Sequence, residues 1–515
     1  MPTLSPTKRS KKSDSTLSQI GRLIGQLREQ KRMTQKELGD AIGSTQSAIA
    51  RIENGEQNVS TEMLSKISAA LDKDIVTVGS GALNIQIEGG RKLSGEIITK
   101  TSKNGAVTLL CAALLNSGKT ILKNVPKIEE TSRIIEVLLS IGVSVKWIGN
   151  DVEIKPPTKI SLKGINKESA IKTRSIILLI GPLLHYLEHF RLPQAGGCKL
   201  GSRTVKPHFY ALEKFGVTID TKSTFYDIIS PKLSPAEVVL YESGDTATAN
   251  AIMAAAKIEG TSVIKFASAN YQVQDLCFLL QELGVKIEGI GTTTLTIHGK
   301  AVIDETVTYF LSEDPIESMF FIAVAAVTKS SITIRRCPID FLEIELLKLE
   351  KMGWKFKLSK PYKALNGYTN LVDIKTSPSK LVALEEKIES RPYPGLNIDN
   401  LPFFAVIATQ AEGTTFIHDW VYEKRAIYYK ELDKLGAETL LADPHRIYIK
   451  GATKLKAAEI IAPPALRPAA IILIGMLAAE GTSTLRNIYS INRGYEDIIK
   501  RLNDIGAHIT ILREF

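Results

Sequence analysis

The 515-residue sequence contains only four cysteines, at positions 111, 198, 277 and 337. They are too few and too widely spaced to form a disulfide framework. No cysteines and histidines have the spacing of metal ligands, so the sequence predicts no metal site, and nothing in it indicates a cofactor. Cys111 and Cys277 lie within apolar helical patterns, which predicts buried structural thiols at both positions.

Long apolar runs are missing as well. The apolar stretches near 174–184 and 469–479 are too short to cross a membrane and are interpreted as buried helices. The first 14 residues are polar and basic and lack the apolar core of a signal peptide. We therefore expect a cytoplasmic protein that makes no contact with a membrane.

The remaining composition is that of an ordinary globular protein, with 44% hydrophobic and 23% charged residues. The length suggests about three or four domains. The formal net charge is +10, and the first 32 residues hold eight lysines and arginines against two acidic residues. We expect residues 1–16 to be a disordered basic arm, and the positive charge suits a nucleic acid or small anionic substrates as partners.

Two short helices joined by a tight turn are predicted next. Thr34 and Glu37 form a capping-box start, Gly43 is a stop, and a second helix over about 45–53 follows almost at once. This is helix-turn-helix geometry, in which the second helix enters the major groove of DNA.

Residues 17–78 resemble the Cro/λ-repressor family of helix-turn-helix domains through the words T-Q-x-E-L-x-x-x-I-G and S-x-I-x-R-I-E-N-G. The resemblance implies DNA binding by residues of the two helices, namely Gln35, Gln46, Ser47 and Arg51. The alternative is a bundle of the same fold that binds another protein.

The rest of the chain repeats one unit six times. The word Leu-x-x-apolar-Gly ends at glycines 142, 216, 284, 353, 436 and 506, which are separated by 74, 68, 69, 83 and 70 residues. Each unit is predicted to run helix–strand–helix–strand, with the glycine ending the second helix. Units of this size need partners to bury a core, so we expect two three-unit lobes with a ligand cleft between them.

This part of the chain resembles the enolpyruvyl transferase family over about 84–512. The motifs that carry the resemblance are Gly89-Gly90-x-Leu-Ser-Gly95, Lys103-Asn104, Asn124-Val-Pro126, Gly196-Gly-Cys-x-x-Gly-x-Arg203, Tyr393-Pro-Gly-x-x-x-Asp399 and Arg493-Gly-Tyr-Glu496. The implied fold is a two-lobed inside-out α/β barrel. Lobe 1 would comprise 84–102 and 311–515, and lobe 2 would comprise 103–310 and carry the Cys198 loop.

Within that family, the motifs match the branch that uses UDP-N-acetylglucosamine, and the P-G-S-K-S-type word of the shikimate branch is absent at 101–106. The resemblance implies transfer of the enolpyruvyl group of phosphoenolpyruvate to the 3′-hydroxyl of the sugar nucleotide, with release of phosphate. This reaction is the first committed step of peptidoglycan synthesis.

The resemblance also assigns roles to individual residues. The resemblance implies that Cys198 is the general acid. Cys198 lies in a glycine-rich loop beside Lys199, and nearby cations lower the pKa of a thiol and make it reactive. Asp399 would accept the proton of the hydroxyl. A cationic clamp of Lys103, Arg203 and Arg493 would hold phosphoenolpyruvate. The sugar nucleotide would contact Asn104, Arg174, Arg203, Asp399, Val421 and Arg425, and Arg467 matches a family arginine in the cleft.

Three positions depart from the family pattern, namely Lys206, Glu242 and Ala465. Because they change charges near the expected nucleotide site, an enolpyruvyl transferase with a different acceptor is one alternative. Another is a transcription regulator that uses a transferase-derived domain as a sugar-nucleotide sensor. The sequence leaves open the oligomeric state and any coupling between the two parts.

Overall fold

The computed structural model describes residues 21, 24–25, 27–29, 31, 33–54, 63, 66–67, 70–71, 83–194, 196 and 204–512. Its contacts divide the chain into an amino-terminal unit that ends at Leu83 and a second unit that begins at Asn84. In the described ranges, no helix has both the length and the apolar character needed to cross a membrane.

The amino-terminal unit contains the predicted pair of short helices. Helix α2 (Gln35–Ala41) starts with a complete capping box between Thr34 and Glu37, and α3 (Gln46–Glu53) is capped by Thr45. Gly43 has a φ of +69°, a left-handed conformation that glycine adopts without steric cost. The two helices contribute to an apolar core that also includes residues before and after them. The core residues are Ile24, Leu38, Ile42, Ile49, Ile52, Ile67 and Leu71.

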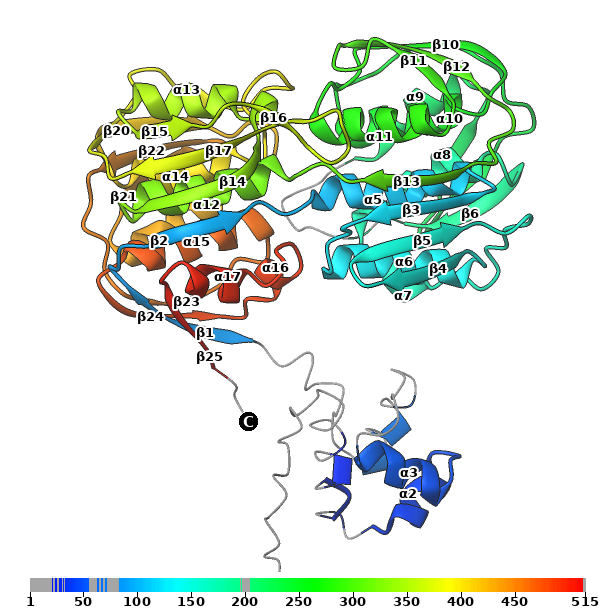
Figure 1. Cartoon of the computed structure of the whole chain (residues 1–515), viewed down its shortest axis with the longest axis horizontal. Helices are drawn as coiled ribbons and strands as arrows, with labels where there is room; N and C mark the ends of the chain where they lie inside the picture. Colours follow the sequence, from blue (N-terminus) through cyan, green and yellow to red (C-terminus); the bar gives the residue numbers. More distant parts are fainter. Residues whose placement is uncertain are drawn as a thin grey trace, which may run out of the picture. The chain divides into compact units, whose positions relative to one another are not determined.

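The described residues of the second unit form six β-sheets, one for each repeat (Figure 1). The first repeat forms the sheet β13-β3-β5-β4 (Thr306–Phe310, Lys119–Lys123, Asp151–Lys155, Ser144–Ile148). The second forms β6-β8-β7 (His189–Pro193, Phe225–Ile229, Thr218–Thr221). The third forms β11-β12-β10-β9 (Lys286–Glu288, Thr294–Gly299, Gly260–Lys265, Glu237–Val239). These three sheets enclose lobe 2.

Lobe 1 holds the other three sheets. The fourth repeat forms β15-β17-β14-β2 (Lys355–Leu358, Asn370–Ser377, Ser331–Pro338, Ser94–Ile98), with β16 (Tyr362–Lys363) beside β17. The fifth forms β18-β20-β22-β21 (Leu381–Val382, Ala411–His418, Arg446–Gly451, Glu438–Asp443), with β19 (Ile388–Glu389) beside β20. The sixth forms β23-β24-β1-β25 (Glu459–Ile461, Gly481–Arg486, Asn84–Gly89, His508–Leu512).

Each repeat contains more strands than the sequence pattern predicts. A second strand follows the one after the repeat glycine and pairs with it antiparallel, as β5 pairs with β4. In the sixth repeat this second strand is β1, from the start of the unit, which pairs antiparallel with both β24 and β25. The glycines have the predicted role, because all six have φ values between 84° and 98°, as expected after a helix end.

The first helix of each repeat lies inside its lobe, and the sheets lie outside. The inner helices are α5 (Lys103–Ala112), η3 with α8 (Arg174–Leu179, Ile180–Leu183) and α10 (Asp245–Ala255) in lobe 2, and α12 (Pro315–Val327), α14 (Leu401–Ala408) and α15 (Leu466–Ala478) in lobe 1. Helices α12 and α14 are buried at every residue, as expected for helices that are apolar on all sides.

The second helices of the repeats are α6 (Glu129–Ser140), α9 (Lys206–Glu213), α11 (Tyr271–Glu282), α13 (Glu343–Lys351), η5 (Ala426–Leu435) and α17 (Ile498–Asp504). Short additional helices are α7 (Lys167–Lys172), η2 (Ala113–Leu115), η4 (Ile339–Phe341) and α16 (Tyr489–Asn492). As predicted, the apolar stretches near 174–184 and 469–479 form buried helices.

Candidate active site

A cavity of about 580 Å³ is lined by residues of both lobes. Its wall includes the first residue of three inner helices, namely Lys103 of α5, Arg174 of η3 and Asp245 of α10. On the lobe 1 side it includes Asp399, just before α14, and Arg467 in the first turn of α15. Helix amino termini carry partial positive charge and unpaired N–H groups. The repeat architecture therefore builds a cavity suited to anions.

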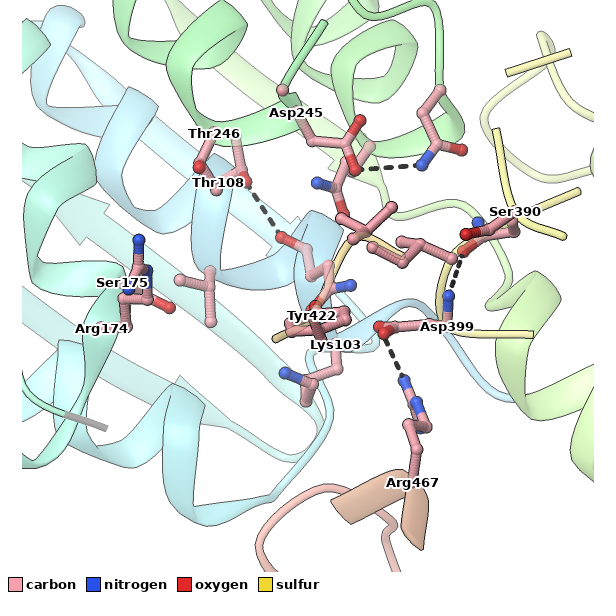
Figure 2. Close-up of a pocket in the computed structure, with 18 of the residues that line it drawn as sticks. Lys103, Thr108, Arg174, Ser175, Asp245, Thr246, Ser390, Asp399, Tyr422 and Arg467 are labelled. Atoms are coloured by element: carbon pink, nitrogen blue, oxygen red, sulfur yellow. Dashed lines mark hydrogen bonds and ion pairs between the residues drawn. The ribbon is translucent and has the colours of Figure 1, made fainter. Parts of the chain in front are cut away.

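Asp399 lies between two arginines in this cavity. Arg467 Nη2 is 3.3 Å from one carboxylate oxygen (Figure 2). Arg425 Nη1 is 3.8 Å from the other oxygen. Burial acts to raise the pKa of Asp399, but the two arginines and Lys103 outweigh it and hold the pKa below its usual range. Asp399 is consequently a carboxylate at neutral pH and can accept a proton.

Arg425 is held from behind by a second carboxylate. Its Nε and Nη2 donate to the two oxygens of Asp419 at 2.6 and 2.8 Å, and Nη2 also donates to the Ile398 carbonyl oxygen at 2.8 Å. Tyr429 donates its hydroxyl to Asp419 at 2.6 Å. These contacts occupy one edge of the guanidinium and leave Nη1 to face Asp399.

Lys103 pairs with Glu130, another residue that lines the cavity, with Nζ 2.8 Å from the carboxylate. Burial opposes ionisation of Glu130, but the charge and hydrogen bond of Lys103 and the charge of Arg493 lower its pKa to about 2. Ser175 donates a further hydrogen bond to Glu130 at 2.9 Å. Glu130 thus fixes the position of the Lys103 ammonium by a charge that persists throughout the physiological range.

Arg467 and Arg493 keep unpaired donors. Arg467 donates to the Tyr495 hydroxyl at 2.7 Å, yet its buried Nε has no hydrogen-bond partner. The buried Nε of Arg493 and Nη1 of Arg425 also lack one. Buried donors without partners are costly, and a bound ligand with several oxygen atoms would satisfy them.

The cavity brings together every predicted substrate or catalytic residue that lies in the described part of the chain. These residues are Lys103, Asn104, Arg174, Asp399, Val421, Arg425, Arg467 and Arg493. Cys198 and Arg203 lie outside the described residues. Of the three departures from the family pattern, Glu242 lines the cavity, Lys206 begins α9 with an exposed side chain, and Ala465 is buried before α15.

The other three cysteines are buried, as predicted for Cys111 and Cys277. Burial raises the pKa of Cys277 and of Cys337 to about 12, and that of Cys111 still higher. These three thiols are therefore protonated and inert at neutral pH.

Sequence reasoning missed several charged groups of the site. Glu130 follows the Asn124-Val-Pro126 motif and had no assigned role. Asp314 precedes Pro315 as the N-cap of α12, which is a recognisable helix start. Burial raises the pKa of Asp314 to about 6, against the opposing charge of Arg467. No local signal in the sequence pairs Asp419 with Arg425.

Comparison with known proteins agrees with this geometry. The family model described as EPSP synthase (3-phosphoshikimate 1-carboxyvinyltransferase) matches residues 87–502. The chain belongs to the enolpyruvyl transferase family. The UDP-N-acetylglucosamine 1-carboxyvinyltransferase of Bradyrhizobium diazoefficiens is 34% identical over 82% of this chain and 96% of the relative. The enzyme of the same name from Treponema denticola is 35% identical over 82% of this chain and 98% of the relative.

Solved structures support the fold of this transferase domain. The enolpyruvyl transferase NikO from Streptomyces tendae has a TM-score of 0.73 and 24% identity, and covers 84% of this chain and 99% of its own. EPSP synthase from Acinetobacter baumannii has a TM-score of 0.67 and 18% identity, and covers 84% of this chain and 100% of its own. The mixed α/β enolpyruvyl transferase fold is thereby confirmed.

The amino-terminal unit matches the helix-turn-helix family over residues 24–78. Gln46, Ser47 and Arg51 of α3 have exposed side chains, while Gln35 is half-buried. The Gln35 amide donates to Glu53 at 2.9 Å, and Arg28 pairs with the same carboxylate through two hydrogen bonds of 2.6 and 3.0 Å. Gln35 thus takes part in tying α2 to α3.

Proposed function

We propose that the transferase domain moves the enolpyruvyl group of phosphoenolpyruvate to the 3′-hydroxyl of UDP-N-acetylglucosamine, with release of phosphate. The observation that carries this proposal is the half-buried, ionised Asp399, which faces cations and unpaired guanidinium donors in one cavity. A carboxylate that can take a proton, placed beside an anion site, is what hydroxyl addition to an anionic enol ester requires.

In this mechanism, Lys103, Arg203 and Arg493 hold the phosphate and carboxylate of phosphoenolpyruvate. Arg203 offers a planar fork and Lys103 a point charge, and both neutralise the anion. Glu130 keeps the Lys103 ammonium at the cavity wall through the 2.8 Å contact. Asn104, Arg174, Val421, Arg425 and Arg467 then position the acceptor.

Proton transfer falls to two residues. Asp399 takes the proton of the attacking hydroxyl while the oxygen bonds to the enol carbon. Cys198 gives a proton to the methylene carbon of the same molecule. The adduct then loses phosphate and a proton from the new methyl group, which restores the enol double bond on the acceptor. The Cys198 thiol could also attack phosphoenolpyruvate covalently, as nucleophilic cysteines do.

The acceptor is assigned from the relatives named above, which are 34% and 35% identical to this chain. Production of the sugar nucleotide ether would place the chain at the first committed step of peptidoglycan synthesis. A different acceptor is the second candidate, because Glu242 adds an acidic group to the cavity wall.

Phosphate release tests the reaction. Purified protein should release phosphate from phosphoenolpyruvate only when UDP-N-acetylglucosamine is present. Asp399→Asn should lower kcat by about 100-fold or more, since a positioned general base contributes about that much. If the protein binds the sugar nucleotide but releases no phosphate with this or any other acceptor tested, the proposed enzymatic activity is refuted. That result would favour a transcription regulator that uses the transferase-derived domain as a sugar-nucleotide sensor.

Alkylation tests Cys198. Fosfomycin, which alkylates the cysteine of this family, should add one mass equivalent to the wild-type protein and none to Cys198→Ser. Addition of the drug to Cys198→Ser to the same extent as to the wild-type protein would contradict the role of this residue.

For the amino-terminal domain, we propose sequence-specific DNA binding through α3 and Gln35. Exposed Gln46 can pair with a base edge, while Ser47 and Arg51 lie on the same short helix. Binding to selected DNA should weaken steeply with salt. Gln46→Ala should reduce the preference for the selected sequence, with Lys36→Ala on α2 as the control. If selection yields no preferred sequence, the domain is a protein-interaction bundle instead.

A further inference from the structure

Phe266 has an unusual backbone conformation for its residue type. It follows strand β10 directly and has a φ of +58°, in the left-handed region that disfavours bulky L-residues. The same position in two other repeats, directly after β3 and β24, also has a positive φ, of 58° and 56°. Those positions hold Asn124 and Asn487, and asparagine tolerates this conformation.

A left-handed residue therefore recurs at this place, and asparagine occupies it in two repeats. Phenylalanine tolerates this conformation poorly, so backbone geometry does not account for its presence. Core packing does not account for it either, because the side chain is 51% exposed. The ring instead lines the wall of the active-site cavity.

Tyr241 leaves the same edge of the sheet as Phe266, and its ring packs against Tyr210 with the two ring centroids 5.6 Å apart. Strands β9 and β10 pair in parallel with Val239 opposite Lys265, so the residues that follow both strands leave the sheet together. The Leu240 amide donates to the Lys265 carbonyl oxygen at 3.1 Å. Tyr241 is 73% exposed and also lines the cavity. Two exposed aromatic rings thus stand at the same edge of lobe 2.

The charge around these rings restricts what they can bind. Asp245 and Glu242 both line this wall. Glu242 Oε1 lies close to Gly244, 3.0 Å from the position that a Cβ atom would occupy if this residue had one. Carboxylates repel a diphosphate, so the charged part of a nucleotide is disfavoured here. An uncharged planar ring is compatible with both features, because it stacks on aromatic side chains and can donate N–H groups to carboxylates.

We propose that Phe266 and Tyr241 form a stacking surface for the base of the acceptor nucleotide, and that Phe266 thereby selects the acceptor. This inference rests on the proposed transfer to a nucleotide sugar. It assigns the edge of lobe 2 to the base, and the cationic wall near Lys103 and Arg493 to phosphoenolpyruvate.

The test is Phe266→Asn, which installs the residue found at the equivalent position of two other repeats. The variant should fold with an unchanged or higher midpoint of thermal unfolding, because asparagine fits the left-handed backbone. Its Kd for UDP-N-acetylglucosamine and for UMP, measured by calorimetry, should rise about ten-fold or more, as expected for loss of base stacking. The KM for phosphoenolpyruvate should stay the same, and Phe266→Tyr should keep wild-type affinity.

The possible outcomes separate this inference from the proposed function. Wild-type turnover with unchanged nucleotide affinity in Phe266→Asn would overturn the stacking surface and leave the reaction standing. Nucleotide binding that depends on Phe266 in a protein without turnover would support the surface and refute the reaction. If Phe266→Asn loses as much affinity for N-acetylglucosamine 1-phosphate as for the nucleotides, the assignment of this surface to the base is overturned. A wild-type protein that binds no nucleotide would also overturn it.

Discussion

Asp419→Asn should strongly destabilise the transferase domain, although Asp419 does not line the cavity. Both Asp419 and its partner Arg425 are fully buried, and the carboxylate accepts two hydrogen bonds from Arg425 and one from Tyr429. Asparagine keeps the shape and one acceptor oxygen but removes the charge. The Arg425 guanidinium is then buried with only the more distant Asp399 as a counter-charge, 3.8 Å away.

The expected loss follows from the cost of an uncompensated buried charge. Removing one partner of a buried ion pair costs about 3–5 kcal/mol of unfolding free energy. The remaining acceptor oxygen and the carbonyl of Ile398 still accept from Arg425, so we expect a loss of about 3 kcal/mol. Urea unfolding followed by circular dichroism at pH 7.5 measures this loss as a lower midpoint at an unchanged slope.

Two further variants make the result decisive. Asp504→Asn removes a carboxylate that pairs with Lys500 at 2.9 Å on the surface, where the side chains are 55% and 75% exposed, and should change little. The double variant Asp419→Leu/Arg425→Met should recover much of the loss, since an apolar pair of similar volume often replaces a buried ion pair without penalty. A loss in Asp419→Asn no larger than that in Asp504→Asn would refute this reasoning.

Two more predictions concern pH. Glu130→Gln should destabilise the domain at pH 7, and its difference in stability from wild type should fade as the pH falls from about 4.5 to about 2. The reason is that the lowered pKa of Glu130 makes its stabilising contribution largest above the unfolded value of 4.5. A difference in urea midpoint that stays constant over this range would contradict this prediction. Asp314→Asn should be more stable than wild type at pH 8, and this gain should shrink between about pH 6 and pH 4. Burial raises the pKa of Asp314 from 3.8 to about 6, so the folded wild-type protein is destabilised only while this group is ionised. A gain in stability that does not depend on pH would exclude this cause.

Local chemistry explains which parts of the fold the sequence predicts. The Thr34–Glu37 capping box and the six glycines that end the second helices depend on backbone conformation and on side chains three residues apart. The second strand of the first repeat also has a local signal, since Gly149-Asn150 between β4 and β5 is a typical two-residue hairpin turn.

Other features depend on residues far apart in the chain. Strand β1 completes the last sheet by pairing Ile85 with Leu485 and with Ile511, which no local pattern specifies. The same holds for the site, where the contact of Lys103 with Glu130 arises only once α5 and α6 pack. The family motifs located the cationic and acidic residues of the cavity, while their charge partners required the folded structure.

The acidic residues of the cavity divide into two kinds, and this division bears on the acceptor. Asp399 and Glu130 have cationic partners that keep their pKa values low, so they belong to an electrostatic framework for the reaction. Asp245 contacts only neutral donors among its hydrogen bonds, from Ser268 and Asn270, and burial raises its pKa. With Glu242 it makes one wall poor in positive charge, so the diphosphate of a nucleotide sugar is better placed toward Arg174, across the cavity from Asp399 and Arg467 (Figure 2). If the lobe 2 wall selects the acceptor as proposed, substitutions there should change the KM for the acceptor before they change kcat.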